Sequence, residues 1–144
     1  MEHFEELALE RQHCFRLYAT SKELIRRYKE WLDPLGLSYT QYLVMLVLWE
    51  QEKLRMQAIG KALRLDSGTL TPVLTKLEAA GLVARETDAT DGRASLFFPT
   101  KQGWELQKEA RKVPHKMASC VPMKPERAAL LAELLDEALS LMSE

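Results

Sequence analysis

The stretch LRLDSGTLTPVLTKLEAAG, residues 63–81, contains an amphipathic helix and its end signal. Its apolar residues follow the i, i+3, i+4, i+7 spacing of a helix with one buried stripe. They are Leu70, Val73, Leu74 and Leu77. The predicted helix reaches about Ala80, and Gly81 marks its end. Its start stays open between Ser67 and a later residue, because Pro72 belongs in or near a first turn.

A shorter helix is predicted just before this stretch, over residues 56–63. Only residues 64–66 separate the two, and two short helices joined by so tight a turn indicate a helix-turn-helix. After Gly81, the segments LVARE (82–86) and LFF (96–98) have the composition of short strands. Because they flank the polar turn TDATDGRAS, they predict a β-hairpin wing.

Further helices are predicted on both sides of this centre. Their expected bounds are about 5–33, 38–49, 101–112 and 125–142. A capping box, Ser38 with Gln41 three residues later, opens the second of them. The terminal helices carry broad apolar faces. These faces require a packing partner, which is either a second subunit or another part of the same chain.

The composition is that of one globular domain. The 144 residues are 47% hydrophobic and 28% charged. The start MEHFEELALERQ is acidic, unlike a signal peptide, and the longest apolar run, LVMLVLW, is too short to cross a bilayer. We therefore expect a cytoplasmic protein without membrane contact. Residues 53–101 carry eight Lys and Arg against five Asp and Glu, although the whole chain has a net charge of −1. A basic centre is a weak indication of phosphate binding.

The polar face of the helix within 63–81 suits the major groove of DNA. It carries Ser67, Gly68, Thr69, Thr71, Pro72, Thr75 and Lys76. Small hydroxyl side chains at a helix start let the backbone approach DNA, donate to phosphates and contact thymine methyl groups. On an isolated helix the same residues would be explained as caps of a surface helix. Their combination with a wing makes double-stranded DNA the better prediction.

The wing supplies a second set of candidate DNA contacts. Arg93, at the polar tip, is placed to enter a narrow minor groove. Asp91 is expected to fix the Arg93 guanidinium by a charge-assisted hydrogen bond. Arg85, on the hairpin stem, is either a phosphate contact or a solvated charge.

Cys14 lies on a packing face of the first predicted helix. The face steps by four and three residues, through Cys14, Tyr18, Ser21, Ile25, Tyr28 and Leu32. A cysteine there is usually a small hydrophobic residue. Tyr28 is roughly 21 Å further along the same helix, but antiparallel packing of two copies would bring it to the other chain's Cys14. A phenol that donates to the sulfur favours the thiolate, which is the form that peroxides attack. His13 and Arg16 either add positive charge there or face water.

Three runs of the sequence carry a family resemblance: QHCFRLYATSKELIRRYK (12–29), LGLSYTQYLVMLVLWE (35–50) and LRLDSGTLTPVLTKLEAAGLVARETDATDGR (63–93). They resemble the organic-hydroperoxide-sensing branch of the MarR family of winged-helix repressors, over nearly the whole chain. By this resemblance, a homodimer binds a pseudo-palindromic operator and releases it when an organic hydroperoxide oxidises Cys14. Tyr28 and Tyr39 would hydrogen-bond Cys14 across the dimer, and Tyr18 would line the same pocket.

The expected fold is mainly α with a small β-hairpin wing. The winged helix-turn-helix DNA-binding unit covers residues 38–100 of a single chain, 1–144, and helices over 5–33 and 101–144 form the dimerisation region. The family usually has leucine at the position of His13, proline at that of Thr40, and E-D-E-R where this chain has residues 90–93. The D-x-R element of the wing is intact.

Cys120 lies among three prolines, at a helix end or in a loop. On position alone it is either an incidental surface thiol or a functional one. Two-cysteine members of the resembled branch carry a second cysteine in this region. The resemblance therefore implies that Cys120 resolves the sulfenic acid of Cys14 by forming an intersubunit disulfide.

Two other functions remain open at this stage. A MarR-type repressor could sense a phenolic ligand in a Tyr- and Trp-lined dimer cleft, and a thiol peroxidase would use the same activated cysteine. No enzyme activity is expected, because no redox fold surrounds Cys14. A metal site built from His13, Cys14, His115 and Cys120 fits no standard spacing. We therefore expect neither a metal nor a cofactor.

Overall fold

The structure, a computed structural model, describes residues 1 and 3–143. The chain divides into two compact units, Met1–Val113 and Pro114–Glu144. Seven α-helices are described: α1 (His13–Leu32), α2 (Tyr39–Gln51), α3 (Met56–Leu63), α4 (Ser67–Ala79), α5 (Lys101–Ala110), α6 (Val113–Cys120) and α7 (Pro125–Leu141). Short 3-10 turns cover Glu5–Leu7, Leu9–Arg11 and Asp33–Leu35. The predicted fold class, mainly α with a small wing, is confirmed.

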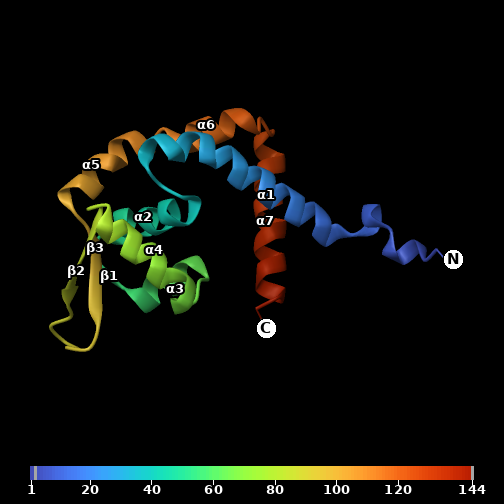
Figure 1. Cartoon of the computed structure of the whole chain (residues 1–144). Coiled ribbons are helices and arrows are strands. Elements are labelled where there is room, and N and C mark those ends of the chain that lie inside the picture. Colours follow the sequence, from blue (N-terminus) through green and yellow to red (C-terminus); the bar gives the residue numbers. More distant parts are fainter. Residues whose placement is uncertain (2, 144) are drawn as a thin grey trace. The chain divides into compact units, whose positions relative to one another are not determined.

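The wing belongs to a sheet of three antiparallel strands in the order β1-β3-β2. Its strands are β1 (Leu54–Arg55), β2 (Val83–Thr87) and β3 (Ser95–Pro99). The hairpin of β2 and β3 was predicted, and in it Arg85 pairs with Phe97. The two-residue strand β1 was not, because so short a segment carries no alternating pattern. It places Arg55 opposite Leu96 and so ties the wing to the start of α3 (Figure 1).

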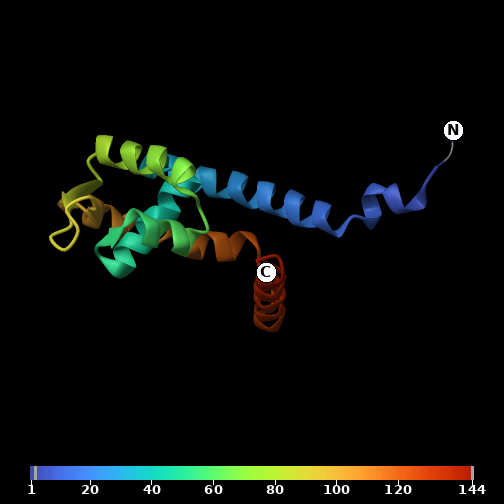
Figure 2. The same ribbon diagram turned by 90° about the horizontal axis from the view of Figure 1, so that it is seen from below.

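The first helix is shorter than predicted. α1 begins at His13, whereas residues 5–11 form two 3-10 turns separated by extended backbone at Ala8. The Gln12 side-chain amide donates to the carbonyls of Glu6 and Ala8, at 2.8 and 3.2 Å. A side chain therefore satisfies carbonyls that a continuous helix would bond through its backbone. No residue of these two turns is buried, so no packing holds them in an α-helix. Figure 2 shows this end of α1 projecting from the rest of the first unit.

The core of the first unit gathers around α2. The predicted capping box is present: the Gln41 N–H donates to Ser38 Oγ, and the Ser38 N–H donates to the Gln41 side chain. The side chains packed here are Leu32, Val44, Met45, Leu48, Ile59, Leu70, Leu74, Leu77, Phe97 and Val113. The Trp49 indole donates to the Gly103 carbonyl at 3.0 Å. These contacts position α3, α4 and the wing as parts of one structure.

The second unit exposes its apolar face. α7 has no buried residue among those described. Its exposed large side chains are Leu130, Leu131, Leu134, Leu135, Leu139 and Leu141. Exposed leucine at helical spacing indicates a face that another element covers. No helix in residues 1 and 3–143 is both long and apolar enough to span a membrane.

Candidate DNA-binding and redox sites

The tight turn between α3 and α4 is stabilised by interactions among the residues of the turn and its flanks. Arg64 adopts the left-handed conformation, with φ 53°. A Cβ on Gly60 would lie 2.7 Å from the Leu65 carbonyl oxygen, so only glycine allows this approach. The Asp66 carboxylate accepts from the Thr69 N–H at 2.7 Å and caps α4. That bond also lowers the pKa of Asp66.

α4 begins at Ser67, which settles the start left open by the sequence. Pro72 lies inside the helix, beyond its first turn. The predicted apolar stripe is confirmed, since Leu70, Leu74 and Leu77 are buried and Val73 is half-buried. Burial of this stripe outweighs the local cost of an internal proline.

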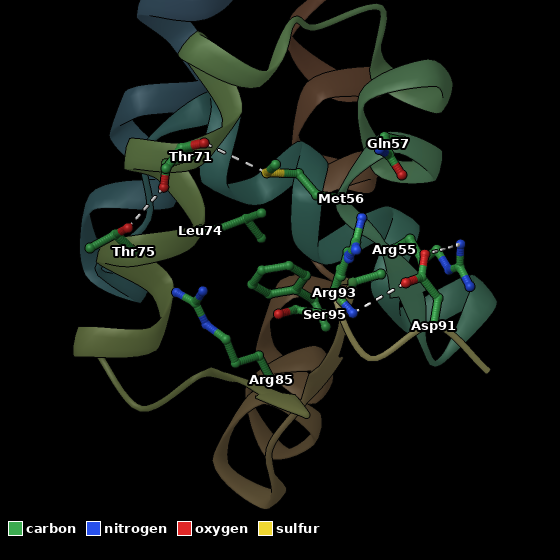
Figure 3. A pocket seen from close by; sticks show the side chains of 12 residues that line it. Arg55, Met56, Gln57, Thr71, Leu74, Thr75, Arg85, Asp91, Arg93 and Ser95 are labelled. Atoms are coloured by element: carbon green, nitrogen blue, oxygen red, sulfur yellow. Dashed lines mark hydrogen bonds and ion pairs between the residues drawn. The ribbon is translucent and has the colours of Figure 1, made fainter. Parts of the chain in front are cut away.

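The opposite face of α4 is exposed. Every predicted DNA-contacting residue of the helix lies there: Ser67, Gly68, Thr69, Thr71, Pro72, Thr75 and Lys76. The Thr71 hydroxyl donates to the Ser67 carbonyl at 2.7 Å. It also lies 3.6 Å from the Met56 sulfur, and the Thr75 hydroxyl donates to the Thr71 carbonyl at 2.9 Å (Figure 3). Because these protons are engaged within the helix, the two hydroxyls offer oxygen lone pairs and methyl groups to a ligand.

The structure contradicts the expected bond between Asp91 and the Arg93 guanidinium at the wing tip. Asp91 does not bind the guanidinium of Arg93: its carboxylate accepts from the Arg93 backbone N–H at 3.1 Å, and its other oxygen lies 3.8 Å from the Arg55 guanidinium (Figure 3). An aspartate carboxylate readily accepts from the backbone N–H two residues later, as in an Asx turn, and Asp91 makes this bond.

Arg55 is a functional candidate that the sequence did not indicate. Its Nε donates to Asp88 Oδ2 at 2.6 Å, across 33 residues of sequence. Asp88 is buried, and its Oδ1 accepts from both the N–H and the hydroxyl of Thr90. These Thr90 bonds, followed by Arg55, lower the pKa of Asp88 to about 2. No local sequence pattern predicts that Arg55 of a strand pairs with Asp88 of a distant turn.

Arg85 lies on the hairpin stem and is neither free nor buried. Its guanidinium donates to both carboxylate oxygens of Glu78 on α4, and it lies 5.2 Å from the Phe97 ring centroid. The ion pair raises the pKa of Arg85. This pair links the wing to the end of α4 and leaves about half of the Arg85 side chain exposed.

A cleft of about 420 Å³ separates α4 from the wing. Its lining includes Arg55, Thr71, Thr75, Arg85, Arg93 and Phe97 (Figure 3). Three guanidinium groups therefore gather beside the hydroxyl-bearing face of α4. This arrangement suits the sugar-phosphate backbone of a nucleic acid.

Both cysteines are exposed free thiols. Cys14 lies in the first turn of α1, and the seam that follows it is open: Tyr18 is 60% exposed and Ile25 44%. The Lys22 ammonium lies 5.1 Å from the Tyr18 ring centroid. Cys120 is the last residue of α6, which agrees with its predicted place at a helix end.

The predicted phenols of Tyr28 and Tyr39 meet in space. Their ring centroids are 4.8 Å apart, and both lie close to the buried ring of Tyr42. Burial raises the pKa of all three phenols, so they stay protonated donors near neutral pH. Trp31 packs edge-on against Tyr28. The sequence argument missed Tyr42 and Trp31, although their positions on apolar helices could have indicated them. Tyr18 stays apart from this cluster within one chain.

Among the residues that the structure describes, no three or more His, Cys, Asp and Glu side chains gather to hold a metal ion.

The sequence pattern of the MarR family matches residues 37–95. The chain is 44% identical to the organic hydroperoxide resistance transcriptional regulator of Bacillus subtilis (strain 168) over 111 residues, which cover 77% of this chain and 76% of that protein. This chain belongs to the MarR family. Among other MarR-type relatives, the HTH-type transcriptional regulator SarZ of Staphylococcus saprophyticus is 37% identical over 88% of this chain and 87% of its own length.

A solved structure of reduced AbfR bound to DNA matches this MarR-family chain with a TM-score of 0.78 and 34% identity, covering 97% of this chain and 98% of that one. AbfR comes from Staphylococcus epidermidis. It is also solved in an overoxidized form bound to DNA and in a disulfide form. The relatives from Bacillus subtilis and Staphylococcus saprophyticus are transcriptional regulators.

Proposed function

We propose that this MarR-family protein is a DNA-binding transcriptional repressor that senses organic hydroperoxides through Cys14. One observation carries the proposal: an exposed thiol stands at one end of the open seam of α1, and a pair of protonated phenols, Tyr28 and Tyr39, stands near the other. The 44% identity to the organic hydroperoxide resistance regulator supports the same function.

The DNA-binding unit covers residues 38–100 in this proposal. α4 enters the major groove with Ser67, Gly68, Thr69, Thr71, Pro72, Thr75 and Lys76. Arg93 enters the minor groove, Asp91 shapes the tip, and Arg85 exchanges part of its contact with Glu78 for a phosphate. The exposure of all seven α4 residues supports this assignment.

The protein acts as a homodimer, with residues 5–33 and 101–144 as the dimerisation region. The exposed seam of α1 and the exposed leucines of α7 support a second copy as the covering partner. Two copies of α4 would then read a pseudo-palindromic operator, because a two-fold dimer presents its helices to successive major grooves. Antiparallel α1 helices would bring Cys14 to Tyr28 and Tyr39 of the partner subunit, beside Tyr18.

The chemical step oxidises one sulfur. The Cys14 thiolate attacks the terminal oxygen of the hydroperoxide ROOH, and the O–O bond breaks. The leaving alkoxide takes a proton and departs as the alcohol ROH, while Cys14 becomes a sulfenic acid. Cys120 of the partner subunit then attacks the sulfenic sulfur, an S–S bond forms and water leaves. We propose that this oxidation is a signal and not a turnover cycle.

Oxidation would release the operator by changing the spacing of the two α4 helices. A new disulfide between Cys14 and Cys120 pulls on the dimerisation helices, and the two α4 helices rotate away from the spacing of one DNA turn. Because both helices must fit their grooves together, a small rotation is sufficient for release.

The test is a mobility shift on the DNA upstream of the protein's own gene, with and without an organic hydroperoxide. The wild type should bind this DNA when reduced and dissociate when oxidised. Cys14→Ser should bind equally well and stay bound after oxidation. Release of the Cys14→Ser variant by hydroperoxide would refute the sensor assignment. Steady peroxide consumption with thiol recycling and without operator binding would instead support a thiol peroxidase.

A second candidate is a repressor that senses a small phenolic ligand. A pocket of about 520 Å³, within the size range of ligand sites, is lined by Ile25, Arg26, Lys29, Leu37 and Tyr39 among others. Release of the operator from Cys14→Ser by a phenolic acid, and not by hydroperoxide, would favour this function.

A further inference from the structure

An ion pair between the half-buried Arg55 and the buried Asp88 lies at the base of the wing tip, outside the predicted DNA-contacting set. Arg55 Nε donates to Asp88 Oδ2 at 2.6 Å, and its NH2 group approaches the same oxygen at 2.5 Å. Asp88 is only 7% exposed. Its other carboxylate oxygen accepts from the Thr90 N–H at 2.9 Å and from the Thr90 hydroxyl at 2.8 Å. The carboxylate therefore accepts three hydrogen bonds and has one further ion-pair contact, which fix its orientation.

Backbone hydrogen bonds from Asp88 and Ala94 close the turn of the tip. The Asp88 N–H donates to the Ala94 carbonyl at 2.9 Å, and the Ala94 N–H donates back to the Asp91 carbonyl at 3.0 Å. Asp91 then holds the Arg93 N–H while it faces Arg55. Arg93 lies between Asp91 and Ala94, whose backbone groups are hydrogen-bonded to each other. Within residues 1 and 3–143, the Arg93 guanidinium has no hydrogen bond or ion pair of its own.

Arg55 connects the tip to the helix-turn-helix. It belongs to β1, pairs with Leu96 of β3, and is the residue before α3. The position of the tip relative to α4 is therefore fixed by a contact that starts in the helix-turn-helix. We propose that Arg55 and Asp88 form an anchor that positions Arg93 for the minor groove, in register with α4 in the major groove. The inference rests on the proposed DNA-binding function and adds two positioning residues to it.

The direction in which Asp88→Asn changes DNA affinity distinguishes a positioning role from a purely electrostatic one. Asp88 is a negative charge beside a surface that binds a polyanion, so removing the charge alone should strengthen DNA binding. If Asp88 anchors the tip, Asp88→Asn should weaken binding instead, because the order of the tip is lost. Glu86→Gln is the matched control: Glu86 is an exposed acid on β2, paired with Lys53 at 2.5 Å, and it does not contact the tip.

The experiment measures operator affinity by fluorescence anisotropy for the full-length reduced protein. Asp88→Asn and Arg55→Gln should each lose about tenfold in affinity, comparable to the loss of a minor-groove arginine. Glu86→Gln should bind as well as the wild type or better. In an Arg93→Gln background, Asp88→Asn should cost nothing further, since its effect passes through Arg93. Stronger binding by Asp88→Asn, or additive losses with Arg93→Gln, would overturn the proposal.

A measurement without DNA separates the anchor from the function. Amide hydrogen exchange at Asp91, Arg93 and Ala94 should be slow in the free wild-type protein and at least tenfold faster in Asp88→Asn, with exchange in α2 unchanged. Equal exchange in the two proteins would refute the anchor. Failure of the wild type to bind any upstream DNA would refute the proposed function, and hydrogen exchange would still decide whether the pair holds the tip.

Discussion

The rings of Tyr28 and Tyr39 have their centroids 4.8 Å apart, although Tyr28 belongs to α1 and Tyr39 to α2. Both pKa values are raised by burial, so both hydroxyls keep their protons at neutral pH. Two adjacent donors of this kind would stabilise a thiolate brought to them by a second subunit. The tyrosine pair at the contact of α1 and α2 is therefore a candidate for activating the cysteine.

Removing these donors should slow the reaction of Cys14. Tyr28→Phe and Tyr39→Phe each delete one hydroxyl and keep the ring, and each should lower the rate of Cys14 oxidation by cumene hydroperoxide about tenfold, the usual worth of a hydrogen bond to a charged group. Operator binding by the reduced variants should match the wild type. Tyr42→Phe, in the same aromatic cluster, is the control. Wild-type oxidation rates in both variants would remove the phenols from the mechanism.

Cys120 should control cross-linking but not the first oxidation. After treatment with hydroperoxide, the wild type should run as a dimer on a non-reducing gel, and Cys120→Ser should run as a monomer. Mass spectrometry of Cys120→Ser should find Cys14 as a sulfenic acid or a higher oxide. A cross-linked dimer in Cys120→Ser, or none in the wild type, would exclude the resolving role.

The two faces of α4 should separate stability from DNA binding. Leu70→Ala empties a fully buried site and should lower the free energy of unfolding by about 2–5 kcal/mol. Lys76→Ala, on the exposed face, should leave that free energy within about 0.5 kcal/mol. It should instead reduce the slope of log affinity against log salt by about one. An unchanged salt slope would show that Lys76 makes no phosphate contact.

The anchor should give the stability a defined pH dependence. Hydrogen bonds from Thr90, and then Arg55, hold the pKa of Asp88 at about 2, below its ordinary 3.8. A carboxylate with a lowered pKa stabilises the folded state above its ordinary pKa, and the contribution is lost as the pH falls through the folded value. The stability difference between the wild type and Asp88→Asn should be constant above about pH 4 and shrink from there to about pH 2.

Urea unfolding at each pH measures that difference. Glu23, with a pKa of about 2 caused by Arg26 and Arg27, titrates in the same range in both proteins, so its effect cancels in the comparison. A difference that persists unchanged at pH 2 would contradict the lowered pKa of Asp88.

Local patterns in the sequence determined the helix-turn-helix. The capping box of Ser38 and Gln41, the stripe from Leu70 to Leu77 and the stop at Gly81 each depend on residues within a few positions of one another. Such interactions form independently of tertiary packing, because helix geometry alone brings the partners together. The same local argument failed for residues 5–12, where no packing was present to favour an α-helix over 3-10 turns.

Contacts between residues that are distant in the sequence depend on tertiary packing. Arg55 and Asp88 are 33 residues apart, and neither carries a local signal for the other. Strand β1, the Tyr28–Tyr39–Tyr42 cluster and the pairing of Arg85 with Glu78 are of the same kind. Their partners are selected by how α2, α4 and the sheet pack around a shared core. The sequence alone therefore determined the helix-turn-helix, the wing hairpin and the faces that they bury, and packing determined which charged and phenolic groups meet.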